Sequence, residues 1–363
     1  MKKIACCGYH ATGSGVISDL LREMNNVACP KYGAEIRLLH DSDCISDLEY
    51  HLVTDPHRLS SGLAIKRFQN YCKEQTRMEY KIFGNMWMEL VNEFANSLII
   101  HSYKGWIDSD LQFMSAWKKR IVFCKKALFF LLRQRPISEL VPKKWQRPRW
   151  FDYYPEYETY YSRLSEESFI AKTKSFVEKL CSVINPEGKE YVLLDQFASA
   201  HNPMRDLRYV DDMKIIIVDR DPRDLYIHHM VHKDHVLPKD PKKFAIQYRL
   251  MRQVLAPEDS QKILRISYED MIFHYEEMVQ KVLDFLGIDK SHHVSVKQYF
   301  KPGVSINGTQ LWRHCVKDYT EAVKIIQEEL PDMLYEFPES SERDRICSEE
   351  NFEQSLKEYE TKH

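Results

Sequence analysis

A glycine-rich turn near the amino terminus has the composition of a phosphate-binding loop. Residues 8–15 read GYHATGSG and lie between the apolar run KIACC at 3–7 and a stretch with helical apolar spacing at 16–24. A strand, a glycine-rich turn and a helix in this order direct main-chain N–H groups at a phosphate. The turn is not a Walker A loop, because no Gly-Lys-Ser/Thr follows it. Taken alone, it is equally compatible with an ordinary turn before a helix.

A second motif places an arginine directly after a buried strand. Residues 215–229 read IIIVDRDPRDLYIHH, so Arg220 follows a β-branched run and Pro222 ends the extended segment. Ligands bind at the carboxyl ends of the strands in open parallel sheets, where a guanidinium can form a fork with a phosphate. Asp224 is expected to cap or salt-bridge the helix that begins here. The alternative is a structural Arg–Asp pair at the strand end.

Two later segments carry further groups suited to a nucleotide. Residues 263–288 read ILRISYEDMIFHYEEMVQKVLDFLGI, in which a strand ends just before Tyr268 and an amphipathic helix follows. An aromatic ring at the end of a strand can stack on a nucleotide or hydrogen-bond to it. Residues 300–315, FKPGVSINGTQLWRHC, combine glycines and hydroxyls with Trp312 and Arg313. This composition suits a flap that wraps a phosphate, and an ordinary surface loop is the alternative.

Alternating strands and helices position these motifs. Strands are expected at residues 3–7, 34–39, 190–195, 213–219 and 262–267. The run MKIIIVD at 213–219 is typical of a central parallel strand. Each strand is followed by a helical pattern, which predicts an α/β fold with a parallel β-sheet flanked by helices. The segment at 60–185 is long, aromatic and mostly helical in pattern, and we interpret it as a helical insertion or cap.

Bulk composition excludes several classes of protein. A formal net charge of −2 argues against a nucleic-acid-binding protein. Nine cysteines without a CxxC pair predict a reducing compartment and no zinc site. The apolar start is too short for a signal peptide, and no apolar window reaches the ~18 residues of a membrane span. We therefore expect a single cytoplasmic domain over residues 1–363, with a polar tail at 339–363.

The order of the four motifs resembles that of the sulfotransferases that depend on 3′-phosphoadenosine 5′-phosphosulfate (PAPS). GYHATGSG is similar to their 5′-phosphosulfate loop, and RDPRD to their 3′-phosphate motif. SYEDM followed by a helix ending in DFLG, and the flap containing Gly308 and Trp312, also match. The resemblance covers roughly residues 3–25 and 190–315 and is closer to the carbohydrate-type bacterial members than to a Walker kinase. It implies a P-loop-kinase-like three-layer fold, transfer to an acceptor hydroxyl, 3′,5′-adenosine bisphosphate (PAP) as product, and no metal.

The resemblance also implies roles for individual residues. The N–H groups of residues 11–15 would hold the 5′-phosphosulfate, Arg220 the 3′-phosphate and Tyr268 the nucleotide near its adenine, while Arg313 would close over the phosphates. The implied cofactor-binding set is Ala11, Thr12, Gly13, Ser14, Gly15, Arg220, His228, Tyr268, Trp312 and Arg313. Ala11 stands where the family usually has lysine, and His228 where it usually has serine. The missing lysine keeps open a catalytically silent nucleotide-binding remnant.

The general base is expected near the strand that precedes the 3′-phosphate motif, where the family usually has His or Glu. That strand reads YVLLDQFASAHNP, so Asp195 lies at its tip and His201 follows in the loop. Asp195 is the first candidate, because partial desolvation would raise its pKa towards neutrality. His201 and then His10 are the next candidates, and a capping carboxylate and exposed histidines are the alternatives.

Basic and aromatic residues in the insertion bear on the acceptor. Lys and Arg interleave with an apolar run at 117–149, and aromatic residues follow at 145–161. A cationic helix over a core is one interpretation; contact with a membrane face, a lipid-linked saccharide or an acidic polysaccharide is the other. The mixture favours a saccharide or glycolipid acceptor over a sterol, lipid or other small hydroxyl compound, with peripheral contact at the inner membrane face. A P-loop nucleotide kinase is the rival enzyme, but the Walker lysine is missing.

Overall fold

The computed structural model describes two compact units. It describes residues 1–30, 34–57, 59–75, 80–105, 108–133, 157–232, 236–314 and 319–338. The core unit comprises residues 1–40, 79–84 and 177–363, and the insert unit comprises residues 41–78 and 85–176. The predicted tail at 339–363 and the basic residues at 134–149 lie outside the described residues. The division into one sulfotransferase domain with a cap at 60–185 stays a prediction.

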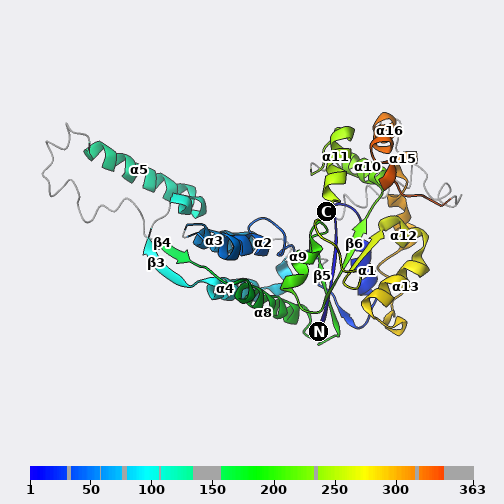
Figure 1. Ribbon diagram of the computed structural model, residues 1–363, viewed down its shortest axis with the longest axis horizontal. Helices are drawn as coiled ribbons and strands as arrows, with labels where there is room; N and C mark the ends of the chain where they lie inside the picture. The colour runs from blue at the N-terminus through cyan, green and yellow to red at the C-terminus, as the bar shows by residue number, and fades with distance from the viewer. Residues whose placement is uncertain are drawn as a thin grey trace. The chain divides into compact units, whose positions relative to one another are not determined.

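A parallel five-stranded sheet forms the centre of the core unit (Figure 1). Its strand order is β2-β5-β1-β6-β7. The strands are β1 (Lys2–Gly8), β2 (Val27–Ala28), β5 (Tyr191–Asp195), β6 (Met213–Asp219) and β7 (Ile263–Ser267). All neighbouring pairs run parallel, and β1 lies between β5 and β6. The predicted α/β architecture is therefore confirmed.

Helices cover both faces of this sheet, which explains the long apolar runs in its central strands. On one face, α1 (Gly15–Arg22), α12 (Tyr268–Phe273) and α13 (Tyr275–Leu286) pack against β1, β6 and β7 in one apolar cluster. On the opposite face lie α9 (Pro203–Asp206) and the end of α8 (Glu166–Ile184), where Glu178 pairs with the buried Lys3 of β1 (Figure 1). A strand buried on both faces needs a continuous apolar run, and β5 is buried at all five positions.

The strand predicted at 34–39 is wrong. Residues 34–37 have no regular structure, and a turn occupies 38–40. The described link to the sheet is a single hydrogen bond, from the Ile36 N–H to the Asp195 carbonyl. Ile36, Leu38 and Leu39 are nevertheless fully buried. The apolar pattern therefore reported burial correctly, and the edge strand is formed earlier, by Val27–Ala28.

The carboxyl ends of the strands all open onto one edge of the sheet. The glycine-rich turn follows β1, residues 196–201 follow β5, Arg220 follows β6 and Tyr268 follows β7. Above this edge, α10 (Pro222–Val231), α11 (Pro241–Met251), α15 (Leu311–His314) and α16 (Thr320–Glu329) share a second apolar cluster (Figure 1). The connections between strands lead to both sides of β1, so the order of the strands reverses there. A ligand crevice is expected at the carboxyl edge of the sheet beside such a point.

In its described residues the insert unit is mostly helical, and it also contains a two-stranded antiparallel sheet. Its helices include α2 (Ile45–Glu49), α3 (Ser60–Gln75), α4 (Met86–Leu98) and α5 (Ala116–Arg133). Strands β3 (His101–Gly105) and β4 (Tyr157–Tyr161) pair antiparallel. Phe94 stacks on Phe176 at 4.5 Å in the core of this unit. None of the described helices is long and apolar enough to cross a membrane.

Candidate active site

The glycine-rich turn after β1 is held in an unusual backbone conformation. His10, Ala11 and Gly13 have φ angles of 76°, 52° and 86°. Left-handed backbone at non-glycine residues is strained and persists only where the surroundings impose it. Thr12 imposes it here, because its buried hydroxyl donates to the Val218 carbonyl at 2.8 Å and accepts from the Tyr9 N–H at 3.1 Å. The Thr12 hydroxyl therefore holds the turn rather than pointing freely at a ligand.

The main-chain N–H groups of this turn are available to an anion. Among the residues that the structure describes, no acceptor is found for the N–H groups from Ala11 to Gly15, which lead into the first turn of α1. Unpaired N–H groups at a helix start attract negative charge. The Ser14 hydroxyl accepts from Gln196 Nε2 at 2.6 Å, so a residue after β5 fixes this end of the turn. Phosphate binding by these N–H groups stays a prediction.

Arg220 connects the turn with the carboxyl-terminal flap. Its Nη1 donates to the Ala11 carbonyl at 3.1 Å, and its Nη2 donates to the Gly308 carbonyl. The side chain is 6% exposed, and its Nε has no hydrogen-bond partner. Within the described ranges, Arg220 forms no ion pair: Asp219 pairs with Arg252, and Asp221 with Arg223. The structural Arg–Asp pair weighed as the alternative therefore involves neighbours of Arg220 and not Arg220 itself.

Tyr268 fills the space between the turn, Arg220 and the flap. The Arg220 guanidinium lies 5.1 Å from the centre of the Tyr268 ring, and the Tyr268 hydroxyl donates to the Ser305 carbonyl at 2.9 Å. A Cβ atom at Gly13 would lie 2.3 Å from Tyr268 Cδ2, so only glycine allows this close approach. Burial raises the pKa of Tyr268, which keeps its hydroxyl a donor.

Asp224 has a different role from the one expected. The side chain that caps α10 is Asp221, which accepts from the Arg223 N–H at 2.8 Å. Asp224 is fully buried and instead accepts from the Gln310 and Leu311 N–H groups, both at 2.6 Å. Burial, and then the neighbouring Asp221, raise the pKa of Asp224 to about 7. This carboxylate therefore fastens the flap onto the helix that follows Arg220.

The remaining predicted cofactor residues lie around this centre with different degrees of exposure. His228 is half-buried on α10, and its ring lies 4.2 Å from that of His232. Trp312 lies on α15, with the Arg223 guanidinium 4.4 Å from its ring and its own Nε1 without a partner. Arg313 is exposed and lies 5.0 Å from the Trp312 ring. These positions put α15 beside Arg223, and no contact between Arg313 and Arg220 is found among the described residues.

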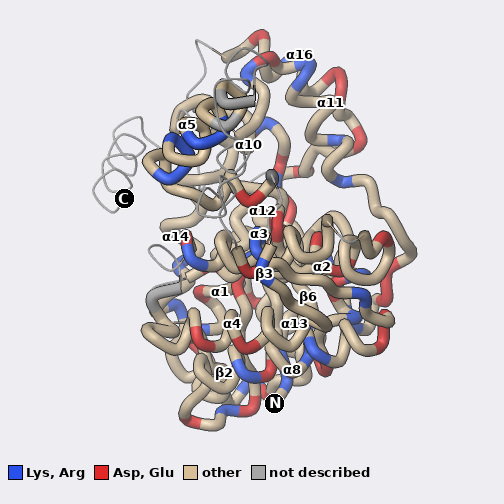
Figure 2. Tube along the Cα trace, turned by 90° about the vertical axis from the view of Figure 1, so that its left-hand side faces the viewer, with Lys and Arg blue, Asp and Glu red and all other residues tan. Residues whose placement is uncertain are grey.

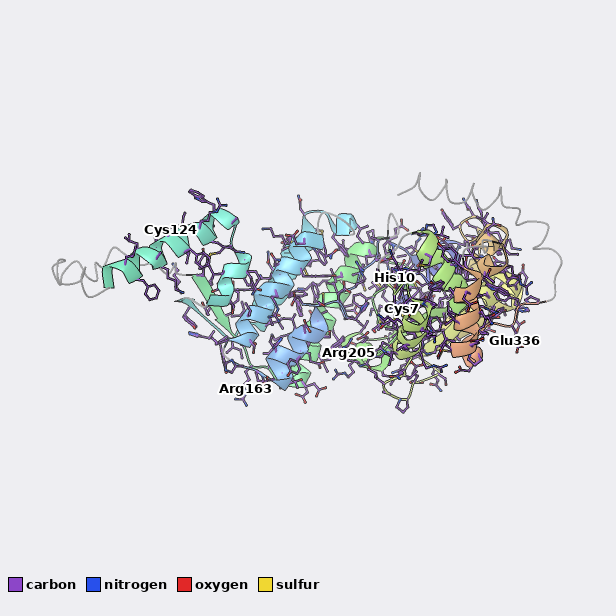
Figure 3. The ribbon with its side chains drawn as sticks, turned by 90° about the horizontal axis from the view of Figure 1, so that it is seen from above. Cys7, His10, Cys124, Arg163, Arg205 and Glu336 are labelled. Carbon is purple, nitrogen blue, oxygen red and sulfur yellow. The ribbon has the colours of Figure 1, made fainter. Side chains whose placement is uncertain are left out.

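A cavity of about 440 Å³ lies beside the glycine-rich turn. Its polar lining comes from His10, His40, Gln196, His201 and Gln247. Figure 3 labels His10, which follows the end of β1. His201 Nδ1 has no hydrogen-bond partner, whereas His40 Nε2 donates to the Gln196 carbonyl at 3.0 Å. Two of the three predicted base candidates, His10 and His201, therefore share one cavity.

Asp195 lies at the tip of β5 as predicted, but its carboxylate is engaged within the protein. Oδ1 accepts from the Cys6 thiol at 3.2 Å, and Oδ2 accepts from the Ser18 hydroxyl at 2.9 Å. Burial raises the pKa of Asp195, the shift expected from the sequence. Asp195 is not among the residues that line the cavity. Its hydrogen bonds tie β5 to β1 and α1.

A buried carboxyl group, Glu269, lies behind Arg220. Glu269 is fully buried; its Oε1 accepts from the Asp221 N–H at 2.9 Å, and its Oε2 has no hydrogen-bond partner. Burial, and then the neighbouring Asp224, raise the pKa of Glu269 to about 8. A protonated Glu269 does not neutralise the positive charge of the nearby Arg220.

Sequence reasoning missed three residues that shape the site. Gln196 fixes Ser14, His40 lines the cavity, and Gln247 reaches it from α11. Gln196 and His40 occur beside apolar runs, as many surface residues do, and no spacing connects them. The left-handed φ of Gln196, 54°, marks it as special only once the backbone is known.

The family model described as the sulfotransferase domain matches residues 126–320, more than half of the chain. No curated protein matches the sequence. Solved structures similar to this one include a sulfotransferase domain from the curacin biosynthetic pathway (13% identity, 97% of this chain and 98% of that one, TM-score 0.37). Others are retinol dehydratase in complex with androsterone and inactive cofactor PAP (14%, 94% and 84%, 0.33) and a sulfotransferase domain from the Synechococcus PCC 7002 olefin synthase (11%, 93% and 96%, 0.37).

Proposed function

Because the chain belongs to the sulfotransferase family, we propose that it moves the sulfuryl group of PAPS to a hydroxyl group of a saccharide or glycolipid. The family match confirms the family predicted from the four motifs. The acceptor class and the roles of individual residues are our proposal. They rest on the turn after β1, on Arg220 and on the cavity lined by three histidines.

The observation that carries the nucleotide half of the proposal is that the buried Arg220 has no direct ion pair among the described residues, while its acidic neighbours Asp224 and Glu269 have raised pKa values. A buried guanidinium is costly unless an anion or a full set of acceptors faces it. Arg220 has two carbonyl acceptors, a free Nε and no carboxylate partner among the described residues. A phosphate supplies the missing negative charge and can accept from Nε. We assign this position to the 3′-phosphate of PAPS.

The transferred group would lie over the glycine-rich turn. Sulfuryl transfer develops charge on the oxygens around sulfur, and donors already aimed at that charge lower the barrier. The N–H groups of Ala11 to Gly15 are such donors, held in place by Thr12 and by the Gln196–Ser14 hydrogen bond. Because these donors and Arg220 neutralise the two anionic groups, the proposal requires no metal.

The geometry favours His201 over Asp195 as the general base. The acceptor hydroxyl must lose its proton beside the turn, and a base has to come within hydrogen-bond reach of it. His201 lines the cavity, and an imidazole ring nitrogen can accept a proton. Asp195 accepts two internal hydrogen bonds and is absent from the cavity wall. We therefore assign Asp195 to positioning β1 and α1.

The cavity wall is mostly apolar, and the polar groups set into it are what a hydroxyl-rich acceptor could use. Its volume of about 440 Å³ is within the usual range for small-molecule sites. Two glutamines and three histidines contribute polar groups that can bond several hydroxyls of a sugar ring. Sugar hydroxyls can hydrogen-bond to such groups, whereas the ring system of a sterol cannot. This comparison is the reason for proposing a saccharide or glycolipid.

A nucleotide-binding titration tests the role of Arg220. We expect Arg220→Ala to weaken PAP by at least about tenfold, since a hydrogen bond to a charged group contributes roughly 1.5–3 kcal/mol. The affinity for adenosine 5′-phosphate, which lacks the 3′-phosphate, should fall much less. Arg249→Ala, which removes an exposed arginine paired with Asp332, is the matched control and should leave both affinities unchanged. Equal losses for the two nucleotides would show that Arg220 does not read the 3′-phosphate.

A turnover assay with PAPS and a panel of acceptors tests the acceptor class. Sulfation of saccharides or glycolipids, with little turnover of sterols, supports the proposal. Sterol turnover alone would overturn the acceptor class and leave the nucleotide assignment intact. PAP binding without turnover on any acceptor would contradict the proposed activity.

A further inference from the structure

Helix α5 exposes its apolar stripe to solvent. Trp117, Ile121, Cys124, Leu128 and Leu131 are spaced so that they fall on one side of the helix. All five are exposed; Trp117 is 68% and Leu131 50% accessible. Figure 3 labels Cys124, the exposed cysteine in the middle of this stripe. A surface helix normally turns such a stripe towards the protein core, so α5 is oriented the other way.

The opposite side of α5 is the one that contacts the protein. Val122 is buried, and Lys119 and Lys126 are half-buried. These three positions are spaced three and four residues apart and therefore share one side of the helix. Burial and solvent exposure thus agree on the orientation. The side of α5 centred on Val122 faces the protein, and the Trp117–Leu131 stripe is presented outwards. Phe123 and Phe130, which lie on a third side, are exposed as well.

The charge of α5 indicates what the stripe contacts. Between Ala116 and Arg133 the sequence contains Lys118, Lys119, Arg120, Lys125, Lys126 and Arg133, and no Asp or Glu (Figure 2). The whole chain has a net charge of −2, so this positive charge is local. Lys118 and Arg120 are exposed beside the stripe, where long side chains can extend their charges into a headgroup layer.

An anionic lipid surface fits both properties together. An interfacial helix combines Trp, Phe and Leu on one face with Lys and Arg around it. A second copy of α5 would bring like charges together, which disfavours pairing of two stripes. An acidic polysaccharide would satisfy the charges but leave the apolar stripe in water. We propose that α5 binds in the headgroup region of an anionic membrane with its Trp117–Leu131 stripe towards the acyl chains. This proposal does not depend on the assigned acceptor.

The test is co-sedimentation of the full chain with lipid vesicles. Vesicles of phosphatidylcholine and phosphatidylglycerol should bind the protein at low salt, and vesicles of phosphatidylcholine alone should bind it weakly. Trp117→Ser/Leu128→Ser should reduce the partition coefficient at least about tenfold, because it removes buried apolar area. Ile246→Ser/Val254→Ser is the matched control, since those side chains are similarly exposed elsewhere. It should bind as the unmodified chain does.

Charge variants test the electrostatic part. Lys118→Gln/Arg120→Gln should weaken binding to the anionic vesicles by about tenfold or more at low salt. Lys242→Gln/Lys243→Gln neutralises two exposed lysines on α11 and should change it little. PAP affinity should be unchanged in every variant, so failure of membrane binding is separable from failure of the nucleotide site.

Three results would overturn the proposal. One is no preference for anionic vesicles in the unmodified chain. Another is equal binding by the α5 variants and their controls. The third is that the unmodified chain does not bind vesicles, while Trp117→Ser/Leu128→Ser, unlike its control, alters the oligomeric state or the melting temperature. Loss of a dimer seen by light scattering would mean that a second copy covers the stripe, and a lowered melting temperature would mean that the chain itself does.

Discussion

The hydrogen bonds of Asp224 predict that a buried carboxylate far from the transferred group controls nucleotide affinity. Asp224 accepts from the Gln310 and Leu311 N–H groups at 2.6 Å, and the same flap places the Gly308 carbonyl on Arg220. In Asp224→Asn one carboxylate oxygen becomes an NH₂ group, which faces a main-chain donor. One charge-assisted bond is lost and one buried N–H is left unpaired.

The size of the effect follows from those two changes. A hydrogen bond to a charged group contributes roughly 1.5–3 kcal/mol, and an unpaired buried donor has a similar cost. If about half of the combined loss appears as weaker docking of the flap, PAP affinity falls by roughly 10- to 100-fold, since 1.4 kcal/mol is tenfold. Calorimetric titration with PAP measures this change.

The pH dependence of PAP binding adds a second readout for Asp224. Its pKa is raised to about 7, so protons bind to it as the pH falls through that value. A protonated oxygen meets a main-chain N–H instead of accepting from it. PAP affinity of the unmodified chain should therefore fall below about pH 7, and Asp224→Asn should remove that step.

The matched control is Asp240→Asn, which alters an exposed aspartate that accepts from the Lys243 N–H at the start of α11. Asparagine caps helices about as well as aspartate, so PAP affinity should not change. If Asp224→Asn folds and binds PAP as tightly as the unmodified chain at every pH, the flap is not held by Asp224 and the reasoning fails.

Four further outcomes can be measured. Glu269 has a pKa of about 8 in the folded protein against an ordinary 4.5, so the free energy of unfolding should fall as the pH rises between those values. Denaturant titrations of Glu269→Gln should lack this pH dependence and give a free energy of unfolding higher by on the order of 2 kcal/mol near pH 8. Gly13→Ala places a Cβ 2.3 Å from Tyr268 and should weaken PAP binding at least about tenfold, which a calorimetric titration measures. His201→Ala should lower turnover on the order of 10²-fold while retaining PAP binding, and Asp195→Asn should act mainly through stability; normal turnover of His201→Ala would reverse that assignment. Excess chelator should leave the turnover rate nearly unchanged, whereas a rate restored only by magnesium would favour a kinase.

Apolar patterning predicted the sheet well where a strand is buried on both faces. MKIIIVD at 213–219 is β6 to the residue, because a central parallel strand leaves no polar alternation to obscure its limits. The same criterion failed at 34–39, where buried Ile36 and Leu38 belong to an irregular segment. Over six residues, a buried irregular segment and a buried strand have the same apolar pattern, and only their main-chain hydrogen bonds distinguish them.

The candidate site divides in the same way. Local sequence was sufficient to place Arg220 at the strand end and the N–H groups of the turn at a helix start. It was not sufficient for Asp224, whose partners are 86 and 87 residues away, or for Gln196 and Ser14, which are 182 apart. Side chains that act by holding distant backbone carry no local signal. The expectation for Asp195 failed to include its thiol and hydroxyl partners for the same reason.

The missing lysine of the turn has a structural counterpart. Ala11 stands where the family usually has lysine, yet the Arg220 guanidinium donates to the Ala11 carbonyl itself. The guanidinium of Arg220 therefore lies against the turn as well as against the flap, and under the proposed function one side chain would serve both ends of the nucleotide site. The two carbonyl bonds fix the guanidinium while its free Nε and its charge remain for an anion. An arginine held in this way loses less conformational entropy than a flexible lysine when a phosphate binds, because its guanidinium is already ordered. Under the proposed function, Arg220 would therefore supply at the turn the positive charge that the absent lysine does not.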